Sequence, residues 1–184
     1  MPDKKKDSIT LGSGDFYIAE FQGTVPELET IKTEENRLAH TKGGASIEYT
    51  VETYTEKDDF GRVSKTIITT EEAILKGGLL AWDGNDIGKL CSTARVNDDT
   101  EKGIRTVKIG GTANDNGKSY VVLFYHPDAK DGDQSVMIVG KNTAGLTITY
   151  STEEGSLLEP EFTAEPMDEE GTLIQFTETI PKSV

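Results

Sequence analysis

The chain has 184 residues and a formal net charge of −14, from 33 acidic and 19 basic side chains. Nucleic-acid-binding surfaces depend on lysine and arginine that neutralise phosphates, so this charge argues against such a surface. Hydrophobic residues make up 34% of the chain, which can fill one core. No apolar run approaches the roughly 18 residues of a membrane-spanning helix. One cysteine excludes an internal disulfide, and Lys4-Lys5-Lys6 is followed by polar residues where a signal peptide has an apolar segment. We therefore expect a single soluble domain that is not exported and does not enter a membrane.

Residues 1–15 are predicted to form a flexible polar arm, because they show no hydrophobic periodicity and end in Gly12-Ser13-Gly14. Residues 16–184 are predicted to form one β domain that opens with a short strand at 16–21. The polar stretch 23–44 has only weak helical character and is predicted to be a long connection. Connections of this length are usually functional.

Residues 47–53 alternate between apolar and polar side chains, which predicts a half-buried strand. The chain then turns at Asp58-Asp59-Phe60-Gly61 and returns as a strand at 63–70, which completes a hairpin. The tip of this hairpin, residues 56–62, is polar except for Phe60. An aromatic side chain on such a tip either is exposed and contacts a partner surface or folds back onto its own strand, and the sequence leaves both possibilities open.

Residues 72–80 are predicted to form another strand, broken by a double glycine at 77–78. One short helix follows, which Asp83 or Asn85 can cap. Apolar residues recur at helical spacing over about two turns, and a tryptophan precedes them. The candidate residues that anchor this helix to the core are Trp82, Ile87 and Leu90.

Residues 104–150 are predicted to be the centre of the fold. Asn116-Gly117 is a strong type I′ hairpin signal and is expected to join a strand at 104–109 to a strand at 119–126. The second of these strands is apolar on both faces, so we expect it to be central and covered on both sides. Further strands are predicted at 136–139, 146–150, 157–165 and 172–179. The expected fold class is mainly β.

No pattern in the sequence indicates catalysis or a bound cofactor. Residues 117–119 have the ending of a phosphate-binding loop, but five residues separate Gly111 from Gly117 where four are needed. A calcium-like loop at 112–123 lacks the carboxylate that its last position requires. His40 and His126 are the only histidines, and their spacing is not that of metal ligands. We therefore predict no catalytic residue, no cofactor and no metal, and a protein that is not an enzyme.

Three motifs and the Asn116-Gly117 turn carry a family resemblance. They are Glu-Asn-Arg-Leu at 35–38 leading to Gly-Gly-Ala-Ser-Ile-Glu-Tyr at 43–49, Ile-Leu-Lys-Gly-Gly-Leu-Leu-Ala-Trp-Asp at 74–83, and Phe-Thr-Ala-Glu-Pro at 162–166. In these motifs and in the order of its elements, most of the chain resembles the major tail tube proteins of tailed bacteriophages. The similarity is greatest to long-tailed siphophages and prophages of Gram-positive hosts.

This resemblance implies a β-sandwich or barrel-like tail-tube fold with one short flanking α-helix. It implies subunits that assemble in the host cytoplasm into stacked hexameric rings and form the hollow tail tube of the virion. Tail tip or initiator, tape measure and tail terminator proteins would be the partners, and DNA would pass through the lumen without specific binding. In that family an N-terminal arm and a loop between early strands contact the neighbouring ring, which here gives the candidates Ile9, Leu11, Phe60 and Arg62.

A monomeric β-sandwich module that binds a ligand or a glycan is the alternative function. Self-association at high concentration separates the two, because a tube subunit polymerises and a binding module stays monomeric. For the tube we further predict that the channel wall is net acidic, because an acidic wall repels a DNA duplex and lets it slide. Acidity that merely keeps an abundant subunit soluble is the other explanation of the charge.

Overall fold

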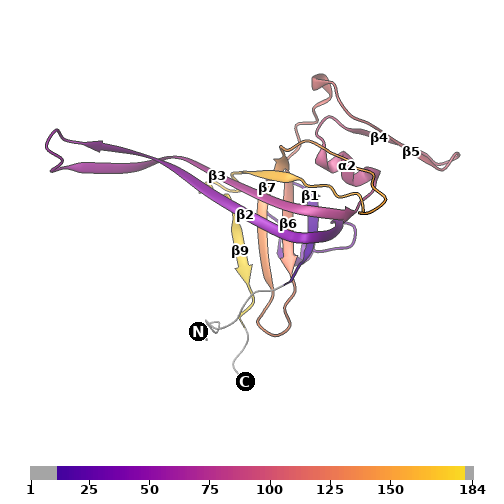
Figure 1. Ribbon diagram of the computed structural model, residues 1–184, viewed down its shortest axis with the longest axis horizontal. Helices are drawn as coiled ribbons and strands as arrows, with labels where there is room; N and C mark the ends of the chain where they lie inside the picture. The colour runs from indigo at the N-terminus through magenta and orange to yellow at the C-terminus, as the bar shows by residue number, and fades with distance from the viewer. Residues whose placement is uncertain (1–11, 181–184) are drawn as a thin grey trace.

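The computed structural model describes residues 12–180 and confirms a mainly β protein. Seven strands form one antiparallel sheet that is nearly closed in a ring (Figure 1). A separate two-stranded hairpin, two short α-helices and one 3-10 helix complete the described part. The strands of the large sheet are β1 (Asp15–Glu20), β2 (Arg37–Lys57), β3 (Ser64–Ala81), β6 (Tyr120–His126), β7 (Gln134–Asn142), β8 (Glu161–Glu165) and β9 (Gln175–Glu178). The hairpin is β4 (Arg95–Asp99) and β5 (Ile104–Lys108), and the helices are α1 (Leu28–Ile31), α2 (Gly84–Leu90) and η1 (Thr112–Asn114).

The strands of the ring pair with a neighbour on each side. β6 lies between β1 and β7, and β1 continues to β2, β2 to β3, and β3 to β8. The outer edge of β7 is shared, because its first half pairs with β9 and its second half with β8. The ring is thus held by backbone ladders, and β9 is an edge strand along part of β7.

Two apolar clusters cover the two faces of β1, β6 and β7. The interior cluster takes residues from strands around the ring, among them Phe16, Val122, Ile138, Leu75 and Phe162. The outer cluster takes the alternate residues of the same central strands and is covered by α1 and by the segment after β8; it contains Tyr17, Ile31, Val121, Leu123, Met137, Val139 and Met167. The prediction that the 119–126 strand is central and covered on both faces is therefore confirmed.

The predicted hairpin through Asn116-Gly117 is wrong. β5 pairs with β4, and β6 pairs with β1 and β7, so the two segments flanking this turn are not partners. A type I′ turn needs positive φ at both central residues, and here only Gly117 has it, at 62°. The Asn116 N–H donates instead to the carbonyl oxygen of Ser92, at 2.9 Å. This contact draws the chain away from β5 and towards the end of α2.

The strands predicted at 63–70 and 72–80 are a single strand, β3, which the double glycine does not break. Gly77 remains in the ladder opposite Ala45, and the ring of Phe16 fills the space where a side chain would stand. The long connection predicted at 23–44 is shorter than expected, because it contains α1 and the start of β2. The fold therefore has two short α-helices where one was predicted.

Residues 146–150 do not form the predicted strand, and the strand predicted at 157–165 is shortened to β8. Leu146 and Ile148 do pack against the interior cluster, as their alternation indicates. No strand among the described residues pairs with this segment, however. The pattern of side chains was thus informative about burial and misleading about strand pairing.

Candidate functional site

The most distinctive feature of the molecule is the outer half of the β2–β3 hairpin, which projects far from the ring (Figure 1). The two strands stay paired from Ser46 and Lys76 out to Lys57 and Ser64. At about 3.3 Å per residue, the nine residues from Tyr49 to Lys57 span about 30 Å. From here on, 'the arm' means residues 47–74, and not the N-terminal arm predicted at 1–15. Its described side chains are exposed beyond the level of Ala73, where the core ends.

The arm has two chemically different faces. Directly paired residues in an antiparallel ladder point to the same side, and the pairs Tyr49 with Ala73 and Thr53 with Ile68 place the apolar residues together. This apolar face carries four large side chains that are 38–58% exposed, namely Ile47, Tyr49, Val51 and Ile68. The opposite face carries most of the charge, with Glu48, Glu52, Glu56, Glu72 and Lys65 around the exposed pair Tyr54 and Ile67.

The prediction of a half-buried strand at 47–53 is wrong in its burial, although its alternation is real. A ribbon of two strands buries a face only if another layer covers it, and among the described residues the segment 170–174 reaches only the base of the arm, near Tyr49 and Glu71. Large exposed apolar surfaces on soluble proteins mark interaction sites more often than chance exposure does. The arm is therefore the best candidate for an interaction surface.

The tip of the arm is a tight turn organised by Asp58. Its carboxylate Oδ1 accepts from the Val63 N–H at 2.8 Å, its N–H donates to the Val63 carbonyl at 3.0 Å, and its carbonyl accepts from the Gly61 N–H at 2.9 Å. The hydrogen bond from the Val63 N–H lowers the pKa of Asp58 below its ordinary value. The predicted turn at 58–61 is confirmed, with Gly61 at a φ of 65°.

Phe60 and Arg62, two of the candidate contact residues, lie together at this tip. Phe60 is 79% exposed, so it does not fold back onto its own strands. The Arg62 guanidinium lies 4.7 Å from the centre of the Phe60 ring, and Arg62 Nε is 3.7 Å from Asp58 Oδ2. The tip thus presents one aromatic ring with a cation stacked on it. The other two candidates, Ile9 and Leu11, lie outside the described residues.

The root of the arm is tightly packed. A β-carbon on Gly77 would lie 2.2 Å from the Phe16 ring, and one on Gly78 would lie 2.3 Å from the Lys42 carbonyl oxygen. Lys76 Nζ is 3.2 Å from Glu48 and 3.6 Å from Glu161, which ties β3 to β2 and β8, and the Glu48 hydrogen bond raises the pKa of Lys76. The register of β2 shifts between Thr41 and Ala45 at this level.

Of the predicted helix-anchoring residues, Trp82 lies between β3 and α2, and Ile87 and Leu90 lie on α2 itself. Trp82 packs against the interior cluster, and its indole N–H donates to the Ser156 carbonyl at 3.0 Å. Ile87 and Leu90 are buried. Asp83 is the helix cap: its carboxylate accepts from the Asn85 and Asp86 N–H groups, and the Asp86 carboxylate accepts from the Asp83 N–H, which completes a capping box.

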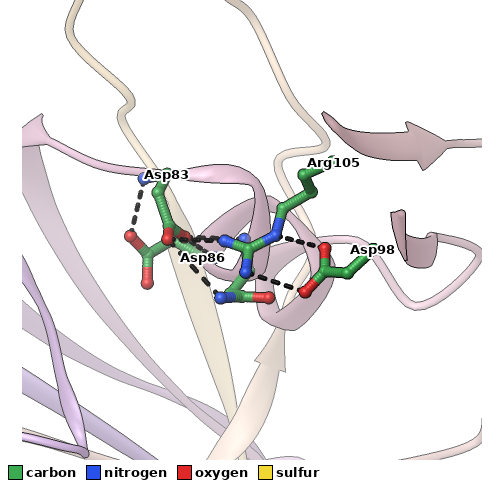
Figure 2. Close-up of polar contacts among 5 residues, drawn as sticks. Asp83, Asp86, Asp98 and Arg105 are labelled. Carbon is green, nitrogen blue, oxygen red and sulfur yellow. Dashed lines mark hydrogen bonds and ion pairs between the residues drawn. The ribbon is translucent and has the colours of Figure 1, made fainter. Parts of the chain in front are cut away.

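Arg105 joins this cap to the β4–β5 hairpin, a contact that sequence analysis did not predict (Figure 2). Arg105 binds Asp98 in a bidentate manner, with Nε to Oδ1 at 2.6 Å and Nη2 to Oδ2 at 2.9 Å. Its Nη1 also lies 2.9 Å from Asp83 Oδ2, so one carboxylate caps α2 and holds the hairpin. The β-branched residues Val96, Ile104 and Val107, on either side of the turn at 100–103, were the signal that could have revealed β4 and β5.

Two glycines one turn apart on α2 let the hairpin approach closely. A β-carbon on Gly84 would lie 2.8 Å from Arg105 Cδ, and one on Gly88 would lie 2.7 Å from Val96 Cγ2. Larger side chains at these positions would push the hairpin away and stretch the Arg105 contacts. The β4–β5 hairpin is thus positioned by close packing as well as by charge.

Residues 12–180 contain no group of three or more histidine, cysteine or acidic side chains arranged to hold a metal ion. In the same part of the chain, no helix has the length and apolar character needed to cross a membrane. Comparison with models of protein families and with curated proteins found no match to this chain.

Proposed function

We propose that this protein is a structural subunit of a virion, which self-assembles into stacked hexameric rings and forms the tail tube of a long-tailed bacteriophage. The proposal combines the family resemblance of the sequence with one structural observation, the projecting arm. We propose no catalytic activity and no bound cofactor for this protein. Its partners are further copies of itself and the proteins that begin, measure and end the tail.

The arm supports the proposal because the described residues 12–180 cover its apolar face only in part. Burying a large apolar side chain contributes about 1.5–3 kcal/mol, and the apolar face presents four that are partly exposed. An isolated two-stranded ribbon is marginal in water, whereas the same ribbon against a neighbouring subunit gains a second layer. Assembly also covers the unpaired edges of both strands, which are otherwise a risk for disordered aggregation.

A shortened arm tests this proposal. Replacing residues 51–71 with Asn-Gly leaves the Thr50–Glu72 pair closed by a two-residue turn and leaves the ring untouched. The intact protein should form rings or tubes in electron micrographs, and its mass should rise with concentration in sedimentation experiments. The shortened variant should keep the circular dichroism of a β protein and stay monomeric.

Two outcomes would contradict the proposal. The first is an intact protein that remains monomeric up to millimolar concentration, even with an assembly initiator present; that result favours the monomeric ligand- or glycan-binding module. The second is a shortened variant that polymerises as well as the intact protein, which would remove the arm from assembly.

A further inference from the structure

A pocket of about 230 Å³ lies where the ring fails to close completely. Its apolar lining comes from Phe124, Val136 and Phe176, and the register shift of β2 contributes Gly43, Gly44 and Ala45. Buried Ser135 and His126 also line it. The pocket therefore lies at the level where the arm leaves the ring and where β9 is an edge strand.

The apolar lining continues a row of the interior cluster. Phe16 is paired with Phe124, Phe124 with Val136, and Val136 with Phe176, so all four point to the same side of the sheet. Burial falls along this row, from a fully buried Phe16 to a Phe176 that is 57% exposed. The Phe16 and Phe124 rings already pack with centroids 5.2 Å apart. One more apolar group beside Phe176 would complete the row.

The volume of the pocket suits one aromatic side chain. An engineered apolar cavity of about 150 Å³ accepts benzene, so 230 Å³ accommodates a phenyl ring with its methylene group. Aromatic rings gain from edge-to-face contacts with other rings, and Phe124 and Phe176 supply them.

The arm tip offers such a ring, and its charge is complementary to the pocket. Residues 57–65 carry Lys57, Arg62 and Lys65 against two aspartates, in a chain whose net charge is −14. The loop 127–133, between pocket residues His126 and Gln134, carries three aspartates and one lysine. Within one subunit the tip of the arm lies far from the closed sheet that holds the pocket (Figure 1). A tip that enters the pocket must therefore belong to a different copy of the chain.

We propose that the Phe60 side chain of one subunit inserts into the Phe124–Val136–Phe176 pocket of another. This inference rests on the proposed self-assembly and specifies which surfaces meet. Arg62, stacked on the Phe60 ring, then approaches the acidic loop 127–133 and favours one orientation of the tip. Phe60→Ala should raise the protein concentration needed for assembly about ten- to a hundredfold, as expected for losing one buried aromatic contact. Ile104→Ala, which removes another exposed apolar group, on the β4–β5 hairpin, should not.

Site-directed cross-linking tests the contact while Phe60 and Phe176 stay in place. One preparation carries Asp59→Cys, next to Phe60, and the other carries Glu178→Cys, which pairs with Gln134 at the pocket. Mixing the two under assembly conditions with a short thiol cross-linker should give a covalent dimer of one chain of each kind. Adding Phe60→Ala to the first should lower the yield at least tenfold. The matched control replaces Glu178→Cys with Glu101→Cys, at the exposed turn of the β4–β5 hairpin.

The outcomes separate this inference from the proposed function. Assembly with a Phe60-dependent cross-link supports both. Assembly in which the Glu178 and Glu101 positions cross-link equally overturns the inference and leaves the tube proposal standing. Absence of assembly overturns the tube proposal and the inference with it.

Discussion

Replacing Gly77 with alanine should destabilise the protein by about 1–2 kcal/mol, because it places a methyl group against the fully buried side chain of Phe16. The new β-carbon would lie 2.2 Å from Cε2 and 2.5 Å from Cζ of Phe16. Phe16 is completely buried, so its ring cannot move out to solvent. Overpacking of this kind costs about 1–3 kcal/mol, and loss of glycine's freedom in the unfolded chain offsets about 0.4–1 kcal/mol.

Urea unfolding followed by the fluorescence of Trp82, the only tryptophan, measures this effect. With a slope of about 2 kcal/mol per molar urea, the midpoint should fall by about 0.5–1 M. In a Phe16→Leu background the same substitution should cost at least 1 kcal/mol less, roughly the coupling expected for residues in contact.

Gly155→Ala is the matched control. Its β-carbon would meet only the end of the exposed Leu80 side chain, at 2.8 Å, so the cost should stay within about 0.5 kcal/mol. Equal costs at Gly77 and Gly155, or an unchanged cost in the Phe16→Leu background, would refute the reasoning that the Phe16 ring makes residue 77 a glycine.

Four other predictions concern the arm, the Arg105 contact, Cys91 and the channel wall. Val51→Lys combined with Ile68→Lys should abolish assembly in sedimentation experiments and leave the urea midpoint unchanged, because both side chains are exposed on the apolar face. The hydrogen bond from Arg105 lowers the pKa of Asp98, so this contact is complete above about pH 4 and is lost as the pH falls through the lowered folded-state pKa. Hydrogen exchange in β4 and β5 should rise over that acidic range, and Asp98→Asn should remove the dependence. Burial raises the pKa of Cys91, so a thiol reagent should label it only as urea unfolds the protein. Assembled tubes should not retain duplex DNA at low salt in a filter-binding assay; tight, salt-sensitive retention in the lumen would contradict an acidic channel wall.

The strands, the helix cap and the turn that depend on neighbouring residues could be predicted from the sequence alone. The apolar runs of β1, β6 and β7 were predicted close to their observed positions, because strand-forming residues and alternation act within a few residues. The Asp83 cap and the turn at 58–61 were predicted for the same reason, since their hydrogen bonds join residues that are near in the chain. The class of the fold follows from these elements together.

Only the tertiary structure decided which strands pair and which faces are covered. The Asn116-Gly117 signal was read as a hairpin, yet β5 pairs with β4, because a ladder is chosen by the packing of whole segments. Alternation at 47–53 identified an apolar face but did not show that this face stays largely exposed. The sequence is compatible with a Phe60 side chain that is exposed or one that folds back onto its own strand. In the structure it is exposed, at the end of an arm that projects from the sheet. The row of Phe124, Val136 and Phe176 likewise exists only because β9, which is distant in the chain, pairs with β7 beside β6. Local patterns encode the elements, and the contacts that make a surface are non-local.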